Sequence, residues 1–243
     1  MTMLKTNENG RSMIEMLGVL AIIGVLSVGG IAGYSKAMNK FKTNKVADNV
    51  SMLVANIKTM YAQQKTYGNL STSSANEMGL IPDELVKKGS DGNNTYKNAY
   101  NGEVEIHTAG STVADRAESS AGAGDGTTKD NKAFVIFFGG LSREACITLA
   151  TNDWGSGYSS GLIAMSASGT SAEADKKRVD DVLIGDDGTQ QRDADAEHSI
   201  TAIPYAIATP GGSNLSVPMK VTDAASACAC NSGNTCAIVW KYY

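Results

Sequence analysis

The chain has few aromatic residues and little net charge, and both shortages limit what it can be. Phe, Trp and Tyr make up 6% of the 243 residues, whereas Ala, Ser, Thr, Gly and Asn are plentiful. Because large apolar side chains fill protein cores, we expect much of the chain to form surface loops. The formal net charge of −4 argues against a strongly basic nucleic-acid-binding protein. The length suffices for one mid-sized domain and an anchor helix.

The sequence also lacks the motifs of common catalytic, phosphate and metal sites, and it has no internal repeat. The glycine-rich stretch 122–126 has no lysine placed to cradle a phosphate. The acidic stretches 186–188 and 193–195 lack the spacing and closing Glu of an EF-hand, which favours a solvated acidic loop over a calcium site. His107 and His198 are interpreted as surface or strand residues. We therefore expect no enzyme activity, no catalytic residue, no metal ligand and no cofactor.

Cysteines are few but even in number: Cys146, Cys228, Cys230 and Cys236. An even count predicts disulfides wherever a domain lies outside the cytosol. A zinc site is disfavoured because Cys228-Ala-Cys230 does not have the spacing of paired zinc knuckles, and neither histidine is near in sequence. The spacing alone leaves the pairing open.

The feature that the chain does have is one long apolar run near its start. No charged residue occurs from Met16 to Tyr34, and about 20 helical residues match a hydrocarbon core of about 30 Å. Glu15 lies at the edge of this run, where an isolated carboxylate costs at least ~2.5 kcal/mol. A secretory signal peptide has a shorter apolar region, followed by its cleavage site. A plain single-span anchor explains the apolar run but not Glu15.

Gly10, the apolar helix and a carboxylate at the fifth residue after Gly10 together form a more specific pattern. It resembles the prepilin signal of type IV pilins and the related pseudopilins. The resemblance implies that prepilin peptidase removes the polar leader 1–10 and leaves Arg11 as the new N-terminus. It also implies that Glu15 pairs with the N-terminal amine of a neighbouring subunit, inside a filament of bundled helices. A buried charge is tolerated only when it is paired, so this contact helps to set subunit register.

Two departures from the family pattern concern the start and the middle of this helix. Arg11 stands where the family usually has an apolar residue. The proline that many relatives carry near mid-helix is absent, and Gly29, Gly30 and Gly33 lie near that place. Since each glycine weakens a helix by about 1 kcal/mol relative to Ala, we expect a local bend or melted segment there.

The membrane orientation is argued from two conflicting signals. Lysines that follow the apolar run would place the C-terminal side in the cytoplasm by a simple positive-inside count. The pilin resemblance places that side outside the cytoplasm, and the cysteines agree with it. We therefore expect one span in the inner membrane with a cytoplasmic N-terminus before assembly, and an extracellular pilus afterwards.

The helix is expected to continue beyond the membrane, from about Ser12 to Thr66. Its second half has apolar residues at three- and four-residue steps: Val46, Val50, Leu53, Ile57 and Met60. That half is therefore predicted to pack on a globular domain, and the alternative is a break near Gly33 and Asn39. The domain organisation is a leader (1–10), a transmembrane and polymerisation segment (11–35) and a globular domain (36–243).

The remaining pattern predicts an α+β fold: a long N-terminal helix on an antiparallel sheet, in a pilin-like lollipop, with short helices. We expect strands in the stretches 103–107, 132–138, 161–166, 202–207 and 235–243, the second covered on both faces. We expect short helices at 74–79, from a capping box at Ser74, at 141–150, with Ser142 as N-cap, and at 222–228. Loops are expected at 89–102, 108–131 and 168–200.

The resemblance to type IVb pilins also bears on the cysteines. In that group one disulfide ties the cysteine-bearing helix to the C-terminal region, which here implies Cys146 with Cys228 or Cys230. The turn 231–234 would bring the remaining pair together. We prefer Cys146–Cys228 with Cys230–Cys236, although the sequence leaves the connectivity open.

The function that the resemblance implies is a structural subunit of a type IVb-like pilus. Its partners would be other copies of itself in a helical homopolymer, prepilin peptidase, the assembly machinery of the inner membrane, and membrane lipid before assembly. The filament surface would serve adhesion, aggregation, motility or DNA uptake, with a host surface or DNA as further partners. The alternatives are a minor pilin, a type II secretion pseudopilin, or a monomeric membrane-anchored periplasmic binding domain.

Overall fold

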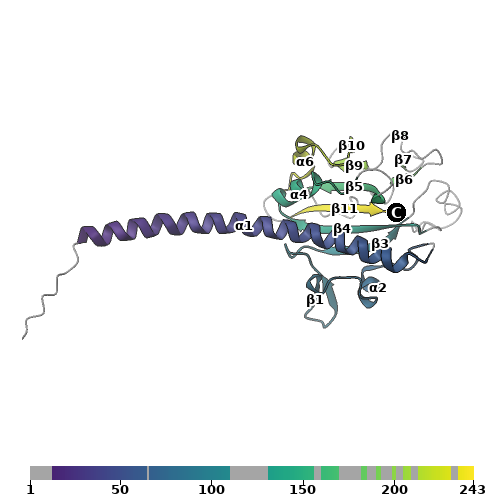
Figure 1. Ribbon diagram of the computed structural model, residues 1–243, viewed down its shortest axis with the longest axis horizontal. Helices are drawn as coiled ribbons and strands as arrows, with labels where there is room; N and C mark the ends of the chain where they lie inside the picture. Colours follow the sequence, from purple (N-terminus) through teal and green to yellow (C-terminus); the bar gives the residue numbers. More distant parts are fainter. Residues whose placement is uncertain are drawn as a thin grey trace, which may run out of the picture. The chain divides into compact units, whose positions relative to one another are not determined.

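The computed structural model describes residues 13–64, 66–109, 131–155, 160–169, 182–184, 190–192, 199–200, 205–208, 213–230 and 235–243. Backbone contacts divide the chain into two units, Met1–Phe41 and Lys42–Tyr243. Helix α1 (Met13–Tyr61) belongs to both, and every other helix and strand belongs to the second unit (Figure 1).

Helix α1 is unbroken through Gly29, Gly30 and Gly33. The expected melted segment is therefore wrong, as is the alternative break near Gly33 and Asn39. Each residue added to an existing helix gains a backbone hydrogen bond. Continuation of the helix through the flanking Leu, Ala, Ile and Val residues therefore offsets the cost of about 1 kcal/mol per glycine.

The second half of α1 packs on the domain, as its periodicity predicts. Its buried residues recur at three- and four-residue steps: Thr43, Val46, Asn49, Val50, Leu53, Ile57 and Tyr61. Met60, expected in this stripe, is half exposed, and Tyr61 takes its place. The helix ends there, before the expected Thr66, because the Gln64 N–H donates to the carbonyl of Tyr61 in a tighter turn.

The main sheet has six strands in the order β10-β9-β5-β11-β4-β3. They are β3 (Val104–Ala109), β4 (Ala133–Leu141), β5 (Leu162–Ser168), β9 (Tyr205–Ala208), β10 (Ser213–Ser216) and β11 (Cys236–Tyr242). All neighbours are antiparallel except β5 and β9, which run parallel. The antiparallel sheet is thus confirmed apart from one parallel pair. The strand expected at 202–207 corresponds to β9, which lies inside the sheet between β10 and β5.

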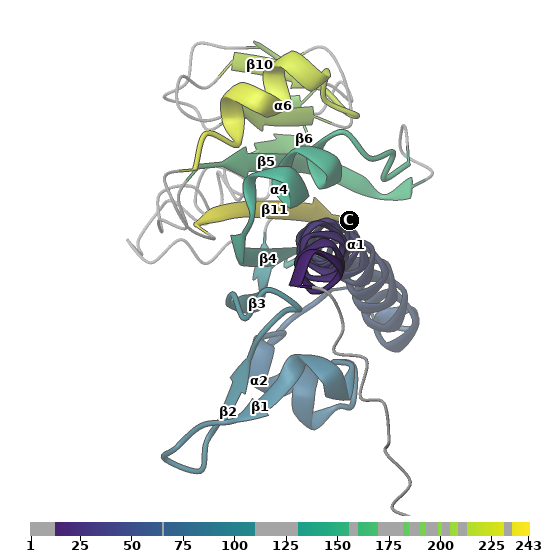
Figure 2. The same ribbon diagram turned by 90° about the vertical axis from the view of Figure 1, so that its left-hand side faces the viewer.

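Strand β4 is buried on both faces, as its unbroken apolar run predicts. Phe134, Ile136 and Phe138 join the larger core cluster, together with side chains of α1, α4 (Arg143–Ala150), α6 (Val221–Ala227) and β11. Val135 and Phe137 face a second cluster on the opposite side. Helices α1, α4 and α6 therefore cover one face of the sheet (Figure 2). The few aromatic residues are concentrated here, where burying each ring contributes about 1.5–3 kcal/mol.

Helix α4 begins where its sequence predicts. Ser142 is the N-cap, and its hydroxyl accepts a hydrogen bond from the Ala145 N–H at 3.2 Å. Ala145, Cys146, Leu149 and Ala150 are buried. Ile147 is only partly buried, because the helix turns Cys146 toward the core.

The segment between α1 and β3 has more regular structure than expected. Helix α2 (Thr72–Glu77) is capped by Ser71 and Ser74, so the capping box starts three residues before the predicted one. The short helix η1 (Asp83–Leu85) leads into a hairpin of β1 (Val86–Lys88) and β2 (Asn94–Tyr96), within a stretch expected to be partly loop. Within the acid-rich stretch 168–200, β6 (Val182–Ile184), β7 (Gln190–Arg192) and β8 (Ser199–Ile200) form a small antiparallel sheet.

Candidate functional site

The first half of α1 presents its apolar side chains outward. Val25, Val28 and Ile31 are 75%, 71% and 68% exposed. An 18-residue window of the helix has a mean hydropathy of 2.2, and none of it is buried. The helix is therefore long and apolar enough to cross a membrane. Because exposed apolar area in water is unfavourable by about 25 cal/mol per Å², this surface requires lipid or other apolar helices around it.

Glu15 lies in the first turn of this apolar half. Its neighbours Ile14 and Leu17 are exposed aliphatic side chains. Among the described residues the Glu15 carboxylate has neither an ion pair nor a hydrogen bond. A helix N-terminus favours a negative charge by up to about 1 kcal/mol, which does not offset transfer of an unpaired carboxylate into hydrocarbon. Within hydrocarbon, a cation from outside the described residues would therefore stabilise this carboxylate.

The two residues of the expected processing site, Gly10 and Arg11, lie outside the described residues. The glycines of the apolar half are informative in another way. A Cβ placed on Gly29, Gly30 or Gly33 would meet no atom within 4 Å. These glycines are therefore not required by packing within the chain, and Gly29 and Gly33 have the small-xxx-small spacing that lets helices approach closely.

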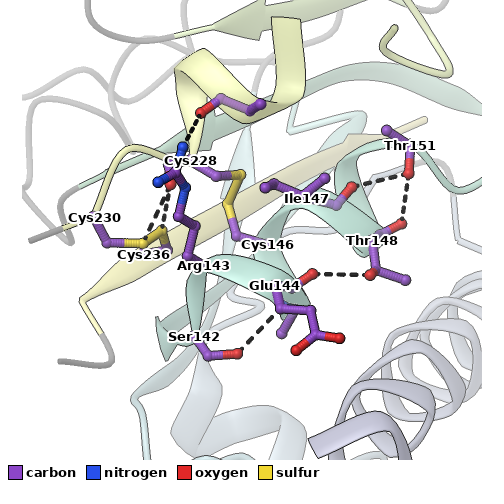
Figure 3. The surroundings of a disulfide bond; sticks show 12 residues. Ser142, Arg143, Glu144, Cys146, Ile147, Thr148, Thr151, Cys228, Cys230 and Cys236 are labelled. Carbon is purple, nitrogen blue, oxygen red and sulfur yellow. Dashed lines mark hydrogen bonds between the residues drawn. A yellow bond between two sulfur atoms is a disulfide. The ribbon is translucent and has the colours of Figure 1, made fainter. Parts of the chain in front are cut away.

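The four cysteines meet between α4, α6 and β11 (Figure 3). Cys146 is joined to Cys228 with a Cα–Cα distance of 5.8 Å, across 82 residues of sequence. Cys230 is joined to Cys236 with a Cα–Cα distance of 5.4 Å, across 6 residues. These are the pairs that the sequence analysis preferred. The sulfur atoms of Cys146, Cys228 and Cys236 all lie within 4.8 Å of one another.

Polar contacts support the longer bridge at both ends. The Arg143 guanidinium donates to the carbonyl of Ala225 at 3.4 Å and so links α4 to α6. The N–H of Met219 donates to the carbonyl of Ala150 at 3.1 Å and joins the segment before α6 to the end of α4. The disulfide and these bonds hold the two short helices as one layer over β11.

Lys58 lies outside the apolar stripe that the sequence predicts for the second half of α1. Its ammonium donates to the carbonyl of Ser160 at 3.0 Å and lies 5.4 Å from the ring centroid of Tyr242. Half-burial lowers the pKa of the Lys58 ammonium. A lysine among polar neighbours gives no sequence signal for this role, which is to fasten the end of α1 to β5 and β11.

The comparison with known proteins agrees with this arrangement. The bundlin family model matches residues 35–190, more than half of the chain. The chain belongs to the bundlin family. This bundlin-family chain is thus a type IV pilin, as the pattern around Gly10 and Glu15 predicts. The match begins at the end of the apolar run and covers most of the domain.

Two curated relatives of this bundlin-family chain are toxin coregulated pilins. One, from Vibrio cholerae serotype O1, is 29% identical over 152 residues, which cover 61% of this chain and 59% of the relative. The other, from Vibrio cholerae, is 27% identical over 172 residues, which cover 70% and 68% of the two chains. The chain therefore spans less than two thirds of the first relative's length.

Two solved structures are similar to the bundlin-family chain. A type IVb pilin from Salmonella typhi has a TM-score of 0.42 and 15% identity over 80% of this chain and 95% of that one. TcpA, a type IV pilin from Vibrio cholerae El Tor biotype, has a TM-score of 0.42 and 17% identity over 83% and 99%.

Proposed function

We propose that this chain is a structural subunit of a type IVb-like pilus, assembled through the first half of α1. Prepilin peptidase cleaves after Gly10, the inner membrane holds the subunit by the apolar helix, and an assembly machine extracts it. The Glu15 carboxylate then meets the N-terminal amine of Arg11 on a neighbouring copy. Apolar packing between helices supplies most of the cohesion. The role is structural, without catalysis.

The observation that carries this proposal is the apolar half of α1, which combines exposed aliphatic side chains with one unpaired carboxylate. A membrane anchor alone requires only the aliphatic side chains. The carboxylate adds a cost of at least ~2.5 kcal/mol in lipid, which is offset when a second copy brings an amine to it. The same carboxylate therefore favours the assembled state over the lipid-embedded monomer.

The rest of the chain forms the filament surface in this proposal. The domain faces outward, and its polar stretches 108–131 and 168–200 contribute to the surface that serves adhesion, aggregation, motility or DNA uptake. Before assembly the N-terminus is cytoplasmic and the domain periplasmic. A minor pilin or a type II secretion pseudopilin would use the same helix, and these differ from a major pilin in the abundance of the subunit within the filament.

Replacement of Glu15 tests assembly separately from membrane insertion. In cells that carry the assembly machinery, Glu15→Ala leaves an amine unpaired in the helix bundle, a cost of about 3 kcal/mol or more. Since 1.4 kcal/mol is a tenfold change, we expect the yield of sheared filaments to fall by roughly a hundredfold. Asp48→Ala, which removes an exposed carboxylate from the domain half of the same helix, should keep both yield and membrane insertion.

A monomeric membrane-anchored binding domain makes the opposite prediction. For such a protein, Glu15→Ala and Asp48→Ala would behave alike, and shearing would release no polymer of the wild type. Normal filament yield from Glu15→Ala would likewise refute the proposed role of the carboxylate.

The processing step has its own test. Mass spectrometry of sheared filaments should find Arg11 as the first residue and this chain as the most abundant subunit. Gly10→Ala should remain at full precursor length in cells that contain prepilin peptidase. If wild type and Gly10→Ala have the same length there, cleavage after Gly10 does not occur.

A further inference from the structure

A pocket of about 360 Å³ opens in the second unit between α1, η1 and the loop that joins β2 to β3. All of its lining residues belong to that unit, and none of them is a cysteine. Its walls come from three stretches of chain: Lys45 and Asn49 of α1; Glu84, Leu85 and Lys87 of η1 and β1; and Asn98, Ala99 and Asn101 of the loop.

Asn49 supplies an unmet hydrogen-bond donor in this wall. The residue is only 2% exposed, and its neighbour Val50 on the helix is fully buried. The side-chain nitrogen Nδ2 of Asn49 has no hydrogen-bond partner among the described atoms. Buried polar groups are nearly always paired, so an orphaned amide that lines a pocket points to an acceptor that enters the pocket.

Two acceptor groups of the wall already have partners. The Glu84 carboxylate pairs with the Lys45 ammonium at 2.5 Å. The side-chain oxygen of Asn98 accepts from the N–H groups of Tyr100 at 2.8 Å and Gly102 at 3.2 Å. These contacts connect η1 to α1 and fix the turn of the loop before β3, so they help to hold the wall in place.

Lys87 adds a positive charge that is not neutralised. Its side chain is exposed, and within the described part of the chain its ammonium has no ion-pair partner. The pocket therefore combines a free ammonium with an orphaned amide N–H, while its one carboxylate is committed to Lys45. This combination fits an incoming carboxylate, which accepts from both donors.

We propose that this pocket receives the carboxylate of an Asp or Glu side chain from a second copy of this chain, an inference that rests on the proposed pilus function. Lys45 and Asn49 lie on the same unbroken helix as the apolar half. Association through that helix holds neighbouring domains together at high effective concentration. Acidic residues outnumber basic ones, 25 to 21, so each copy carries acids in excess. The pocket thus sets the register between domains, as Glu15 does between helices.

Zero-length carbodiimide cross-linking of sheared wild-type filaments tests the contact, because it joins a lysine to a carboxylate only when the two touch. Covalent dimers are isolated on a denaturing gel, and their joined peptides are identified by mass spectrometry. We expect Lys87 joined to an Asp or Glu of the second copy. Lys87→Gln should abolish that dimer, whereas Lys88→Gln, which alters the next exposed lysine outside the pocket, should leave it unchanged.

A second variant separates a binding role from a packing role. Asn49→Leu removes the orphaned donor while keeping a side chain of similar size. We expect the detergent-solubilised monomer to unfold at the same or a higher urea concentration than wild type, while filament yield falls at least fivefold. A parallel loss of monomer stability and filament yield would assign Asn49 to packing and overturn the proposal.

The remaining outcomes distinguish failure of the proposed pocket contact from failure of the proposed pilus function. If filaments form normally but the cross-linked dimers contain no Lys87 linkage, the proposed contact in the pocket is refuted and the pilus function stands. Wild-type cells that yield no filaments overturn both. Sodium acetate can also be titrated while the Asn49 side-chain amide resonance is followed. A saturable shift of that resonance, with no intermolecular Lys87 linkage in filaments, would assign the pocket to a free small carboxylate and refute binding of a second copy.

Discussion

The two disulfides should differ in their contribution to stability because they close loops of very different length. Cys146 and Cys228 are 82 residues apart, and Cys230 and Cys236 are 6 apart. In the chain-entropy description, the longer loop stabilises the folded state by about 4.5 kcal/mol and the shorter by about 2 kcal/mol. Replacing both cysteines of a pair by Ala should therefore cost roughly 2 kcal/mol more for the longer loop.

Urea unfolding of the full chain in mild detergent measures this difference. The chain has two tryptophans, and Trp154 and Trp240 lie 5.1 Å apart between ring centroids in the core, so their fluorescence reports on the domain. With a urea dependence of about 2 kcal/mol per M, the two double variants should unfold about 1 M apart. Double variants are needed because a single replacement leaves a free thiol near the other bridge.

Equal midpoints for the two double variants would refute the loop-length reasoning. A lower midpoint for the variant that lacks Cys230 and Cys236 would do so more strongly. In either case, packing around the sulfur atoms, rather than restriction of the unfolded chain, would determine the contribution of each bridge.

Three further predictions concern single residues of the domain, all measured by the same unfolding assay. Ser142→Ala removes the cap of α4 and should cost about 1 kcal/mol. Gly102→Ala makes the new Cβ clash with the carbonyl group of Gly139 and should cost at least about 1–3 kcal/mol. Gly68→Ala, whose Cβ meets only a side-chain oxygen at 3.5 Å, should be nearly neutral, and equal losses in the two variants would exclude the clash. Burial raises the pKa of the Tyr242 hydroxyl well above its ordinary value of about 10. Since the folded state then keeps a proton that the unfolded state releases, stability should fall as pH rises above about 10, and Tyr242→Phe should reduce that fall; an unchanged pH dependence in this variant would contradict the assignment.

Much of the fold could be predicted from local patterns. The apolar stripe of α1, the uninterrupted apolar run of β4 and the capping serine of α4 each specify an element through a few neighbouring residues. Glu15 could likewise be singled out by its cost in lipid. Each of these signals depends on the residue itself or on residues one or two turns away.

What could not be predicted depends on contacts between distant stretches. The parallel pairing of β5 with β9 leaves no mark on either strand, because both pairing directions accept the same side chains. In the sequence, Asn49 looks like an ordinary polar residue of a helix. Its side-chain nitrogen is left without a hydrogen-bond partner among the described atoms only because η1 and the loop before β3 pack around it. The same holds for Lys58, because its partners Ser160 and Tyr242 are distant from it in sequence.

The position of β11 has a consequence for biogenesis. This strand follows every other strand in the chain, yet it lies between β4 and β5 in the sheet. Until residue 242 has been synthesised, β3 and β4 have no hydrogen-bonded link to β5, β9 and β10. A chain still being synthesised can therefore form only two separate half-sheets, each with an unpaired strand edge that favours aggregation until β11 joins them.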